Sequence, residues 1–310
     1  MSREKWDANR IPDQKGRVAI VTGSSSGIGY EAARVLAAKN ATVVIAVRNF
    51  EKGDKAAEKI RRNHAAADLR VMRLDLAELA SVANFAEELK ANFSRLDLLI
   101  NNAGVMVPPY AKTADGFELQ FGTNHLGHFA LTGRLLDLLL ETGDSRVVNV
   151  SSGAHKIGNL DFDDLAWEKR SYSPWRAYGD SKIANLYFTF ELDRKLKQHG
   201  QRTIAVAAHP GWTATELQRN TGWMEYLNSI FAQDISMGAL PTLRAAIDPD
   251  LKGAEYIGPD GLMEMGGHPV EVKPNELAQS REIAGKLWQV SEESTGVKFD
   301  FGEKKQTVAG

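Results

Sequence analysis

Short runs of consecutive apolar residues alternate along the chain with longer stretches in which apolar residues recur every three or four positions. Residues 18–22 (VAIVT) form the first run, and 27–40 is a stretch of the second kind, with one apolar face made by Ile28, Ala32, Val35 and Leu36. Short β-branched runs are typical of buried strands, and the longer recurrence is typical of amphipathic helices. The pattern predicts further strands at 42–47, 70–74, 97–101, 146–150, 203–208 and 254–257, and helices at 51–63, 80–92, 117–141 and 178–198.

This alternation extends through most of the chain. Strands that alternate with helices of this length are joined by βαβ crossovers, which build a doubly wound parallel sheet of the Rossmann type. No break in composition divides the 310 residues. We therefore predict a single α/β domain over 1–310, with 1–15 as a lead-in.

Composition excludes several classes of function. The chain has no cysteine, which excludes disulfides, thiolate metal ligands and a cysteine nucleophile. Its 38 Lys and Arg nearly balance 40 Asp and Glu, whereas a nucleic-acid-binding protein normally carries a basic excess. Uninterrupted apolar runs reach about five residues, far below the roughly 20 that a membrane helix needs. Residues 1–15 lack the apolar core of a secretory signal. We expect a cytoplasmic protein without a nucleic-acid partner or a membrane span.

A glycine-rich segment directly follows the first predicted strand. Gly23, Gly27 and Gly29 have the spacing GxxxGxG. Gly23 permits a tight turn, Gly27 permits close approach of the backbone to a diphosphate, and Gly29 permits close packing of helix on strand. The helix that follows would offer its unpaired amides to the anion. A glycine-rich turn without a ligand is the alternative, but the position after the first strand favours a dinucleotide site.

The second predicted strand ends in Ala46-Val47-Arg48-Asn49, without the carboxylate that binds a ribose 2′-hydroxyl. A guanidinium at this position suits a 2′-phosphate, which accepts paired, charge-assisted hydrogen bonds. Arg48 therefore predicts NADP(H) as the cofactor rather than NAD(H). The alternative is an ordinary solvated arginine at a strand end.

Tyr178 and Lys182 are four positions apart in a predicted helix, which places the phenol and the ammonium on one face. A nearby ammonium favours the phenolate and lowers a pKa that is ordinarily about 10, toward the range useful in acid–base catalysis. The pair is weak evidence alone, because an exposed tyrosine and lysine on a helix are common.

Other polar or glycine-containing segments follow the later strands. They are Asn101-Asn102-Ala103-Gly104, Ser151-Ser152-Gly153 and residues 210–215 (PGWTAT), with Asn124 in the predicted helical region. The carboxyl ends of parallel strands meet at one edge of the sheet, where ligands bind. Each segment has an ordinary interpretation as a turn, cap or buried polar group, but together they indicate one active site.

With these motifs combined, the sequence resembles the short-chain dehydrogenase/reductase family over about residues 16–295. The resemblance implies that Ser152 polarises a substrate carbonyl and that Tyr178 donates or accepts the proton. It also implies that Lys182 binds the nicotinamide ribose and tunes Tyr178, and that Asn124 holds a water in a proton relay. Asp75 would bind the adenine amino group, and Thr215 the nicotinamide carboxamide. The full set of implied cofactor contacts is Gly23, Ser25, Gly27, Ile28, Arg48, Asp75, Leu76, Asn102, Ala103, Gly104, Tyr178, Lys182, Pro210, Gly211, Thr213 and Thr215.

Within this family the chain is similar to the retinol dehydrogenase-like branch, through Ile11-Pro12-Asp13, residues 123–129 (TNHLGHF) and the 26 positions from Ser152 to Tyr178. An N-terminal membrane anchor is not recognised, so membrane-bound retinoid metabolism is not implied. The resemblance places a substrate lid at 211–240. The predicted apolar pocket wall comprises Ile157, Phe162, Trp167, Trp175, Trp212, Leu217, Trp223, Met224, Tyr226, Leu227, Ile230 and Phe231. Such a wall suits a hydrophobic aldehyde, ketone or alcohol; equally, these side chains could simply pack the lid onto the sheet.

We predict an NADP(H)-dependent oxidoreductase that transfers hydride between nicotinamide and a carbonyl or alcohol. One alternative is a catalytically silent NADP(H)-binding sensor or scaffold, although such proteins usually lack the Tyr or the Lys. Another is a nucleotide-sugar epimerase, which the GxxxGxG spacing and the small C-terminal part disfavour. No metal is expected, because no carboxylate or thiol cluster joins His125, His128 and His209. The resemblance also raises homo-oligomer formation through the helices at 117–141 and 178–198, which the sequence leaves undecided.

Overall fold

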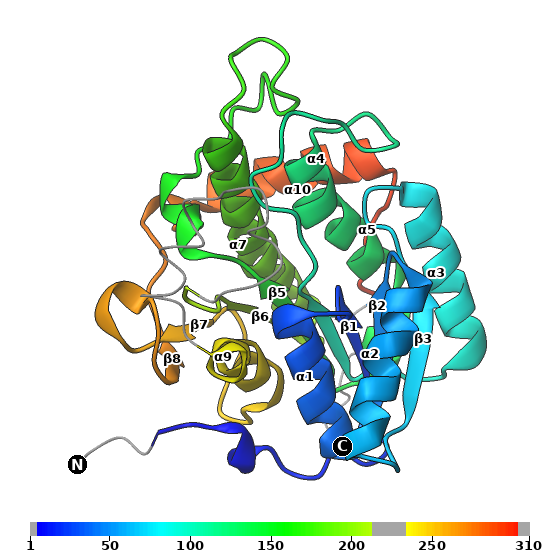
Figure 1. The fold of residues 1–310 in the computed structure, drawn as a ribbon. Helices are drawn as coiled ribbons and strands as arrows, with labels where there is room; N and C mark the ends of the chain where they lie inside the picture. Colours follow the sequence, from blue (N-terminus) through cyan, green and yellow to red (C-terminus); the bar gives the residue numbers. More distant parts are fainter. Residues whose placement is uncertain (1–4, 213–233, 303–310) are drawn as a thin grey trace, which may run out of the picture.

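The computed structural model describes residues 5–212 and 234–302 (Figure 1). The strands are β1 (Val18–Thr22), β2 (Thr42–Val47), β3 (Leu69–Arg73), β4 (Leu98–Asn101), β5 (Arg146–Val150), β6 (Ile204–Ala208), β7 (Tyr256–Pro259) and β8 (Pro269–Glu271). The α-helices are α1 (Gly27–Ala38), α2 (Phe50–Asn63), α3 (Leu79–Asn92), α4 (Leu119–Phe121), α5 (Gly127–Arg134), α6 (Leu136–Thr142), α7 (Pro174–Gln198), α9 (Ile235–Ile247) and α10 (Arg281–Thr295). Shorter turns are the π-helix η2 (Gly122–Leu126) and the 3-10 helices η1 (Ala8–Arg10), η3 (Gly153–Ile157), η5 (Leu262–Glu264) and η6 (Leu277–Gln279).

These strands form one sheet in the order β3-β2-β1-β4-β5-β6-β7-β8. β1 to β7 are parallel, and β8 pairs antiparallel with β7. The chain builds outward from β1 through β2 and β3, then returns to the other side of β1 with β4. This reversal is the switch point of a doubly wound sheet, where ligands bind beyond the carboxyl ends of the strands. The predicted single α/β domain with a doubly wound sheet is confirmed.

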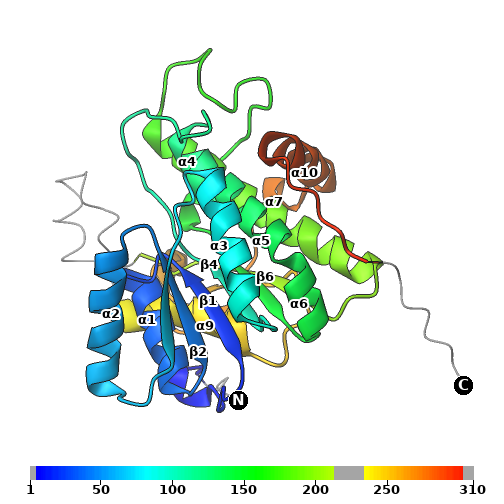
Figure 2. The same cartoon turned by 90° about the vertical axis from the view of Figure 1, so that its right-hand side faces the viewer.

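Helices cover both faces of the sheet (Figure 2), so the central strands are buried on two sides, whereas the edge strands β3 and β8 are partly exposed. Alternate side chains of each strand point to opposite faces. Ala19 therefore packs in the core layer with α1, α2 and α9, and Ile20 packs in the layer with α3, α5, α6 and α7. The lead-in belongs to the first layer, because Trp6 and Ile11 are buried in it.

Several elements differ from the sequence prediction. α7 begins at Pro174, four residues before the predicted start, because proline is well suited to the first turn of a helix. The predicted helix 117–141 is divided into α4, the π-helix η2, α5 and α6. Of the lid predicted at 211–240, residues 235–240 begin α9, in which Leu240 is buried against the sheet, and 213–233 lie outside the described residues.

The C-terminal helix α10 was not predicted as an element, and it covers α7 and α5 (Figure 1). Trp288 of α10 packs edge-on against Phe129 of α5, with ring centroids 5.2 Å apart. Phe299 follows the helix and lies 4.8 Å from the Phe129 ring. The apolar faces of α5 and α7 are therefore buried within this chain. No helix among the described residues is long and apolar enough to cross a membrane.

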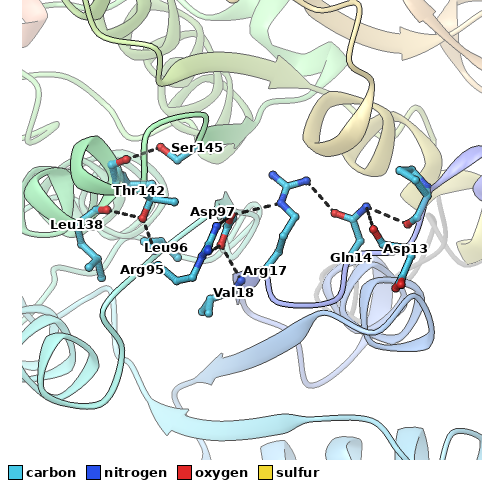
Figure 3. A network of polar contacts seen from close by, with 12 residues as sticks. Asp13, Gln14, Arg17, Val18, Arg95, Leu96, Asp97, Leu138, Thr142 and Ser145 are labelled. Atoms are coloured by element: carbon cyan, nitrogen blue, oxygen red, sulfur yellow. Dashed lines mark hydrogen bonds and ion pairs between the residues drawn. The ribbon is translucent and has the colours of Figure 1, made fainter.

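A polar network ties the lead-in to the amino ends of β1 and β4 (Figure 3). The buried Asp97 carboxylate accepts hydrogen bonds from the Arg95 guanidinium at 2.7 and 2.9 Å and from the Val18 amide at 2.9 Å. Arg17 lies 3.4 Å from the same carboxylate and donates to the Gln14 side chain at 2.8 Å. Burial alone would raise the pKa of Asp97, but these donors and charges outweigh it and lower the pKa. The network stabilises the amino ends of β1 and β4, on the side of the sheet opposite the carboxyl ends of the strands.

Candidate active site

A cavity of about 740 Å³ opens at the carboxyl ends of the central strands. Every predicted cofactor contact within the described residues lines it, from Gly23 after β1 to Gly211 after β6. Ser152, Tyr178 and Lys182 line it as well. The predicted contacts Thr213 and Thr215 lie outside the described residues. The doubly wound topology thus brings motifs separated by nearly 190 positions, from 23 to 211, into one site.

The glycine-rich loop has the backbone geometry that requires glycine. Gly23 and Gly27 have φ values of +67° and +59°, in the left-handed region that other residues rarely adopt. A Cβ on Gly29 would lie 2.4 Å from the Asn102 side-chain nitrogen and 2.7 Å from the Gly23 carbonyl oxygen, closer than atoms can approach. The side chain of Ser26 makes no capping hydrogen bond to α1. The first turn of α1 therefore keeps amides that can bind an anion.

A single buried hydroxyl joins this loop to the segment after β4. The Thr22 hydroxyl accepts hydrogen bonds from the backbone amides of Asn102 and Ala103, each at 2.9 Å. It also lies 2.9 Å from His128 Nε2, and His128 Nδ1 lies 2.9 Å from the Asn124 carbonyl oxygen. Burial lowers the pKa of His128 to about 4, so its ring is neutral near pH 7. Because a carbonyl can only accept, Nδ1 carries the proton and Nε2 accepts from Thr22.

Ser152 and Tyr178 form the centre of the site. The Tyr178 side chain is buried, which raises the pKa of its phenol to about 12, although a hydrogen bond from Ser152 opposes the increase. Ser152 follows β5, where its hydroxyl also accepts from the Ala154 amide at 3.2 Å and caps η3. The phenol is therefore protonated at neutral pH in the protein without ligand, ready to act as a proton donor.

Lys182 lies one helical turn after Tyr178 in α7, as its spacing predicts. Its Nζ is 5.6 Å from the centre of the Tyr178 ring and donates to the Val150 carbonyl oxygen at 3.1 Å. Burial lowers the pKa of Lys182 to about 8. Among residues 5–212 and 234–302, the ammonium makes one hydrogen bond to protein, which leaves two donors for a ligand.

Asn124 lies just behind the cavity wall, in the π-helix η2, and is fully buried. Its side-chain oxygen accepts from the Val105 amide at 2.8 Å, and its side-chain nitrogen donates to the Val105 carbonyl at 2.9 Å. The same nitrogen donates to the Ser181 hydroxyl at 2.9 Å. The side chain of Asn124 thus holds the loop after β4 against α7. π-Turns of this kind occur often at functional sites.

The end of the cavity beyond β2 carries positive charge. Arg48 is exposed there, and the structure adds Asn49 and Lys52, which the sequence prediction did not include. Asn49 caps α2 by accepting from the Lys52 amide at 2.9 Å, which places the lysine in the first turn of that helix beside Arg48. Lys52 could have been predicted from the sequence, because it follows Arg48 by four positions, near the start of the predicted helix. Asp75 after β3 lines the same end and accepts from the Ala77 amide at 3.0 Å.

The opposite end of the cavity is apolar. Of the predicted wall residues, Ile157, Trp175 and Trp212 line it, but Phe162 and Trp167 do not. Trp167 is instead buried, and the Arg170 guanidinium carbon lies 3.7 Å from the centre of the Trp167 ring. Phe162 packs beside α7 and α10. The sequence places four of these residues in the insertion between Ser152 and Tyr178, but it cannot show which way each side chain points. The four are Ile157, Phe162, Trp167 and Trp175.

Further residues that line the cavity were not among the predicted contacts. They include Val105, Met106, Thr123, His209, Met263, Glu264 and Met265. The carboxylate of Glu264 lies 3.0 Å from His209 Nε2 and 3.5 Å from Lys156 Nζ. The contact with His209, together with the Lys156 charge, lowers the pKa of this carboxyl. Within residues 5–212 and 234–302, no three His, Asp or Glu side chains gather as metal ligands would.

A doubly wound sheet with a glycine-lined cavity at its carboxyl edge, where Ser152 lies with the buried Tyr178 and Lys182, defines the class of dinucleotide-binding oxidoreductases. The profile of the short chain dehydrogenase family matches residues 17–225. The chain therefore belongs to the short-chain dehydrogenase/reductase family, whose members bind nicotinamide cofactors and act on CH–OH and C=O groups. The resemblance inferred from the sequence is confirmed.

Individual relatives support the same branch. Retinol dehydrogenase 12 of Mus musculus is 41% identical over 290 residues, which cover 92% of this chain and 88% of the relative. Polyprenol dehydrogenase of Homo sapiens is 36% identical over 300 residues, which cover 93% and 87%. The crystal structure of an uncharacterized protein from Mycobacterium paratuberculosis is 42% identical, with a TM-score of 0.82 and coverage of 96% of this chain and 100% of that one. The Pseudomonas aeruginosa RhlG/NADP complex is 25% identical, with a TM-score of 0.63 and coverage of 81% and 97%.

Proposed function

We propose that the protein is an NADP(H)-dependent oxidoreductase that interconverts an apolar carbonyl compound and its alcohol, with Tyr178 as the general acid and base. The observation that carries the proposal is the buried Tyr178 phenol, whose pKa responds to Ser152 and which is followed one helical turn later by Lys182, with all three residues lining one cavity. One end is lined by glycines and cations, and the other by apolar side chains.

The residues present fit a nicotinamide dinucleotide. Gly29 cannot carry a Cβ, and Gly23 and Gly27 present no side chain at their left-handed positions, so a diphosphate can approach the amides of α1. Such a cofactor, when bound, supplies or accepts the hydride. Within the described residues Lys182 keeps ammonium donors for ribose hydroxyls, and Asp75, to which the family resemblance assigns the adenine contact, lines the same cavity.

Ser152 and Tyr178 would act together on the substrate oxygen. In the reduction direction the Ser152 hydroxyl donates to that oxygen and stabilises the negative charge that develops on it. Tyr178 then transfers its phenolic proton to the same oxygen; the transfer is favourable even with the phenol pKa raised to about 12, because an alkoxide is a stronger base than a phenolate. In the oxidation direction Tyr178 must accept a proton, and the Lys182 ammonium stabilises the resulting phenolate.

The preference for NADP(H) rests on the charge beyond β2. Arg48 and Lys52 offer two cations to a 2′-phosphate, and within the described residues no carboxylate pairs with Arg48. RhlG of Pseudomonas aeruginosa, a structural neighbour, is described in complex with NADP, which agrees with this choice.

The apolar end of the cavity supports a hydrophobic substrate. Met106, Ile157, Trp175, Met263 and Met265 supply long, adaptable or aromatic side chains around the site. Relatives are named for retinol and polyprenol, which are both long apolar alcohols. We propose long apolar aldehydes and alcohols of this kind as the substrate class.

The test is the consumption of NADPH by the purified protein, followed by absorbance, with a panel of aldehydes and ketones that includes retinal. Turnover is expected with apolar members. Tyr178→Phe should lose about 10²–10⁴-fold in kcat while it retains NADPH binding. Tyr187→Phe is the matched control, since this buried tyrosine of α7 donates to the Leu277 carbonyl, away from the cavity. Full turnover by Tyr178→Phe would reject the mechanism, and tight NADPH binding without oxidation of any panel member would favour the silent sensor.

Cofactor choice has its own test. Arg48→Asp should weaken NADPH binding about 10–100-fold, the scale of one or two lost charge-assisted hydrogen bonds, and leave NADH binding within about threefold. Arg62→Asp makes the same charge change near the far end of α2 and should alter neither affinity. Equal affinities of the wild-type protein for NADPH and NADH would contradict the preference.

A further inference from the structure

The segment after β4 is held by two side-chain amides from one helical stretch. Asn124 binds both the amide and the carbonyl of Val105, at 2.8 and 2.9 Å. Four positions earlier, the Gln120 side-chain oxygen accepts from the Val107 amide at 2.8 Å. Residues four apart lie on the same side of a helix, so the two amides hold the loop on either side of Met106. Met106 lines the cavity.

The conformation held at Val107 is one that this residue would not adopt by itself. Its φ is +54°, in the left-handed region, and for a β-branched side chain this is a genuine outlier. Backbone outliers persist only where the surroundings impose them, and they concentrate at functional sites. The backbone amide of Val107 is held in this conformation by its hydrogen bond to Gln120.

Gln120 is also bound to the other wall of the cavity. Its side-chain nitrogen donates to the Pro174 carbonyl and to the Tyr172 hydroxyl, each at 2.9 Å. Tyr172 in turn donates to Glu118 at 2.9 Å. Pro174 is the first residue of α7 and directly precedes Trp175, which lines the cavity. The three partners fix the orientation of the amide, because Pro174 can only accept and the Val107 amide can only donate.

Gln120 itself has no access to the cavity. It is fully buried and does not line the wall. A polar side chain is costly to bury unless its hydrogen bonds are made. The Gln120 oxygen binds Val107 on one wall, and its nitrogen binds Pro174 on the other. It joins two segments that are more than 60 positions apart in the sequence, 107 and 174.

We propose that Gln120 is a positioning residue for substrate selection: its amide clamps Val107 and Pro174 and thereby sets Met106 and Trp175 at the spacing that admits an extended apolar substrate. The inference rests on the proposed oxidoreductase function for its kinetic consequence. The clamp itself is independent of that function. We expect short substrates to reach Ser152 and Tyr178 without contacting Met106 or Trp175, so that only longer ones are affected.

The clamp is tested first without catalysis, by hydrogen–deuterium exchange. Gln120→Met keeps the approximate volume and removes all three hydrogen bonds. Peptides covering 104–110 should exchange at least about tenfold faster, the scale of one lost buried hydrogen bond, while peptides from β1 and α1 are unchanged. The exposed Gln289→Met of α10 is the control and should leave both regions unchanged. Unaltered exchange at 104–110 in Gln120→Met overturns the clamp, whatever the protein's activity.

The kinetic arm uses straight-chain aldehydes of increasing length with NADPH. For Gln120→Met we expect KM to rise about tenfold for the longest aldehydes, with kcat and the NADPH affinity within about twofold and short aldehydes unaffected. Gln120→Met with Val107→Gly should recover part of this loss, because glycine adopts a positive φ without the hydrogen bond. A uniform loss of kcat at every chain length, without recovery by Val107→Gly, would overturn the selective role. If none of the aldehydes supports NADPH oxidation by the wild-type protein, the proposed function fails. The hydrogen–deuterium exchange result then decides the clamp by itself.

Discussion

Replacement of Thr22 by valine isolates the contribution of one hydroxyl to the site. Thr22 is fully buried, and its hydroxyl makes three contacts of 2.9 Å, with the amides of Asn102 and Ala103 and with His128 Nε2. Valine has nearly the same shape, so Thr22→Val removes these contacts without opening a cavity. A buried polar group that loses its partner costs about 1–3 kcal/mol. The two amides are only half-buried and recover some hydration, so we take about 1 kcal/mol for each and about 1–2 kcal/mol for the buried ring nitrogen.

The sum is about 3–4 kcal/mol, a large part of the 5–15 kcal/mol typical of a folded domain. Urea unfolding of the wild-type protein, Thr22→Val and Thr22→Ser measures this loss of unfolding free energy. Thr22→Ser keeps the hydroxyl and loses only a methyl group, about 1 kcal/mol. Because residues 102–104 line the cofactor cavity, NADPH titration should also show about tenfold weaker binding by Thr22→Val. Equal unfolding free energies for the valine and serine variants, within about 0.5 kcal/mol, would refute the reasoning.

Three further changes follow from the same structure. Ser152→Ala should lower kcat about 10²–10³-fold with the NADPH affinity unchanged, measured by steady-state kinetics and titration, because it removes a donor to the developing alkoxide. Gly29→Ala should weaken NADPH binding more than about tenfold and lower Tm, since its Cβ would overlap Asn102. Asp97→Asn should lose about 2–3 kcal/mol at pH 7 by urea unfolding. Because the pKa of Asp97 is lowered in the folded protein, its stabilisation exists above its ordinary pKa near 4 and disappears as pH falls through the folded pKa. The difference between wild type and Asp97→Asn should therefore shrink on acidification, and a difference that is constant with pH would contradict this assignment.

The sequence by itself determined the architecture and most of the residues that line the candidate site. The alternation of apolar runs and amphipathic stretches predicted the strands of the parallel sheet within one or two residues, because strands buried on both faces need uninterrupted apolar runs. The spacing of Gly23, Gly27 and Gly29 predicted the tight loop, since these backbone conformations and contacts exclude other side chains. The i,i+4 spacing of Tyr178 and Lys182 predicted their juxtaposition, because it depends only on the geometry of one helix.

The tertiary structure alone decided what depends on contacts between distant segments. That Trp175 lines the cavity while Trp167 lies buried beneath Arg170 is set by packing, which the sequence of the insertion does not encode locally. The burial of α5 and α7 beneath α10, and the pKa of Tyr178 raised to about 12, depend on side chains that surround these groups from several elements. The hold of Gln120 on Val107 likewise joins segments that have no motif. Local periodicity and spacing are properties of neighbours along the chain, whereas burial, orientation and pKa are properties of neighbours in space.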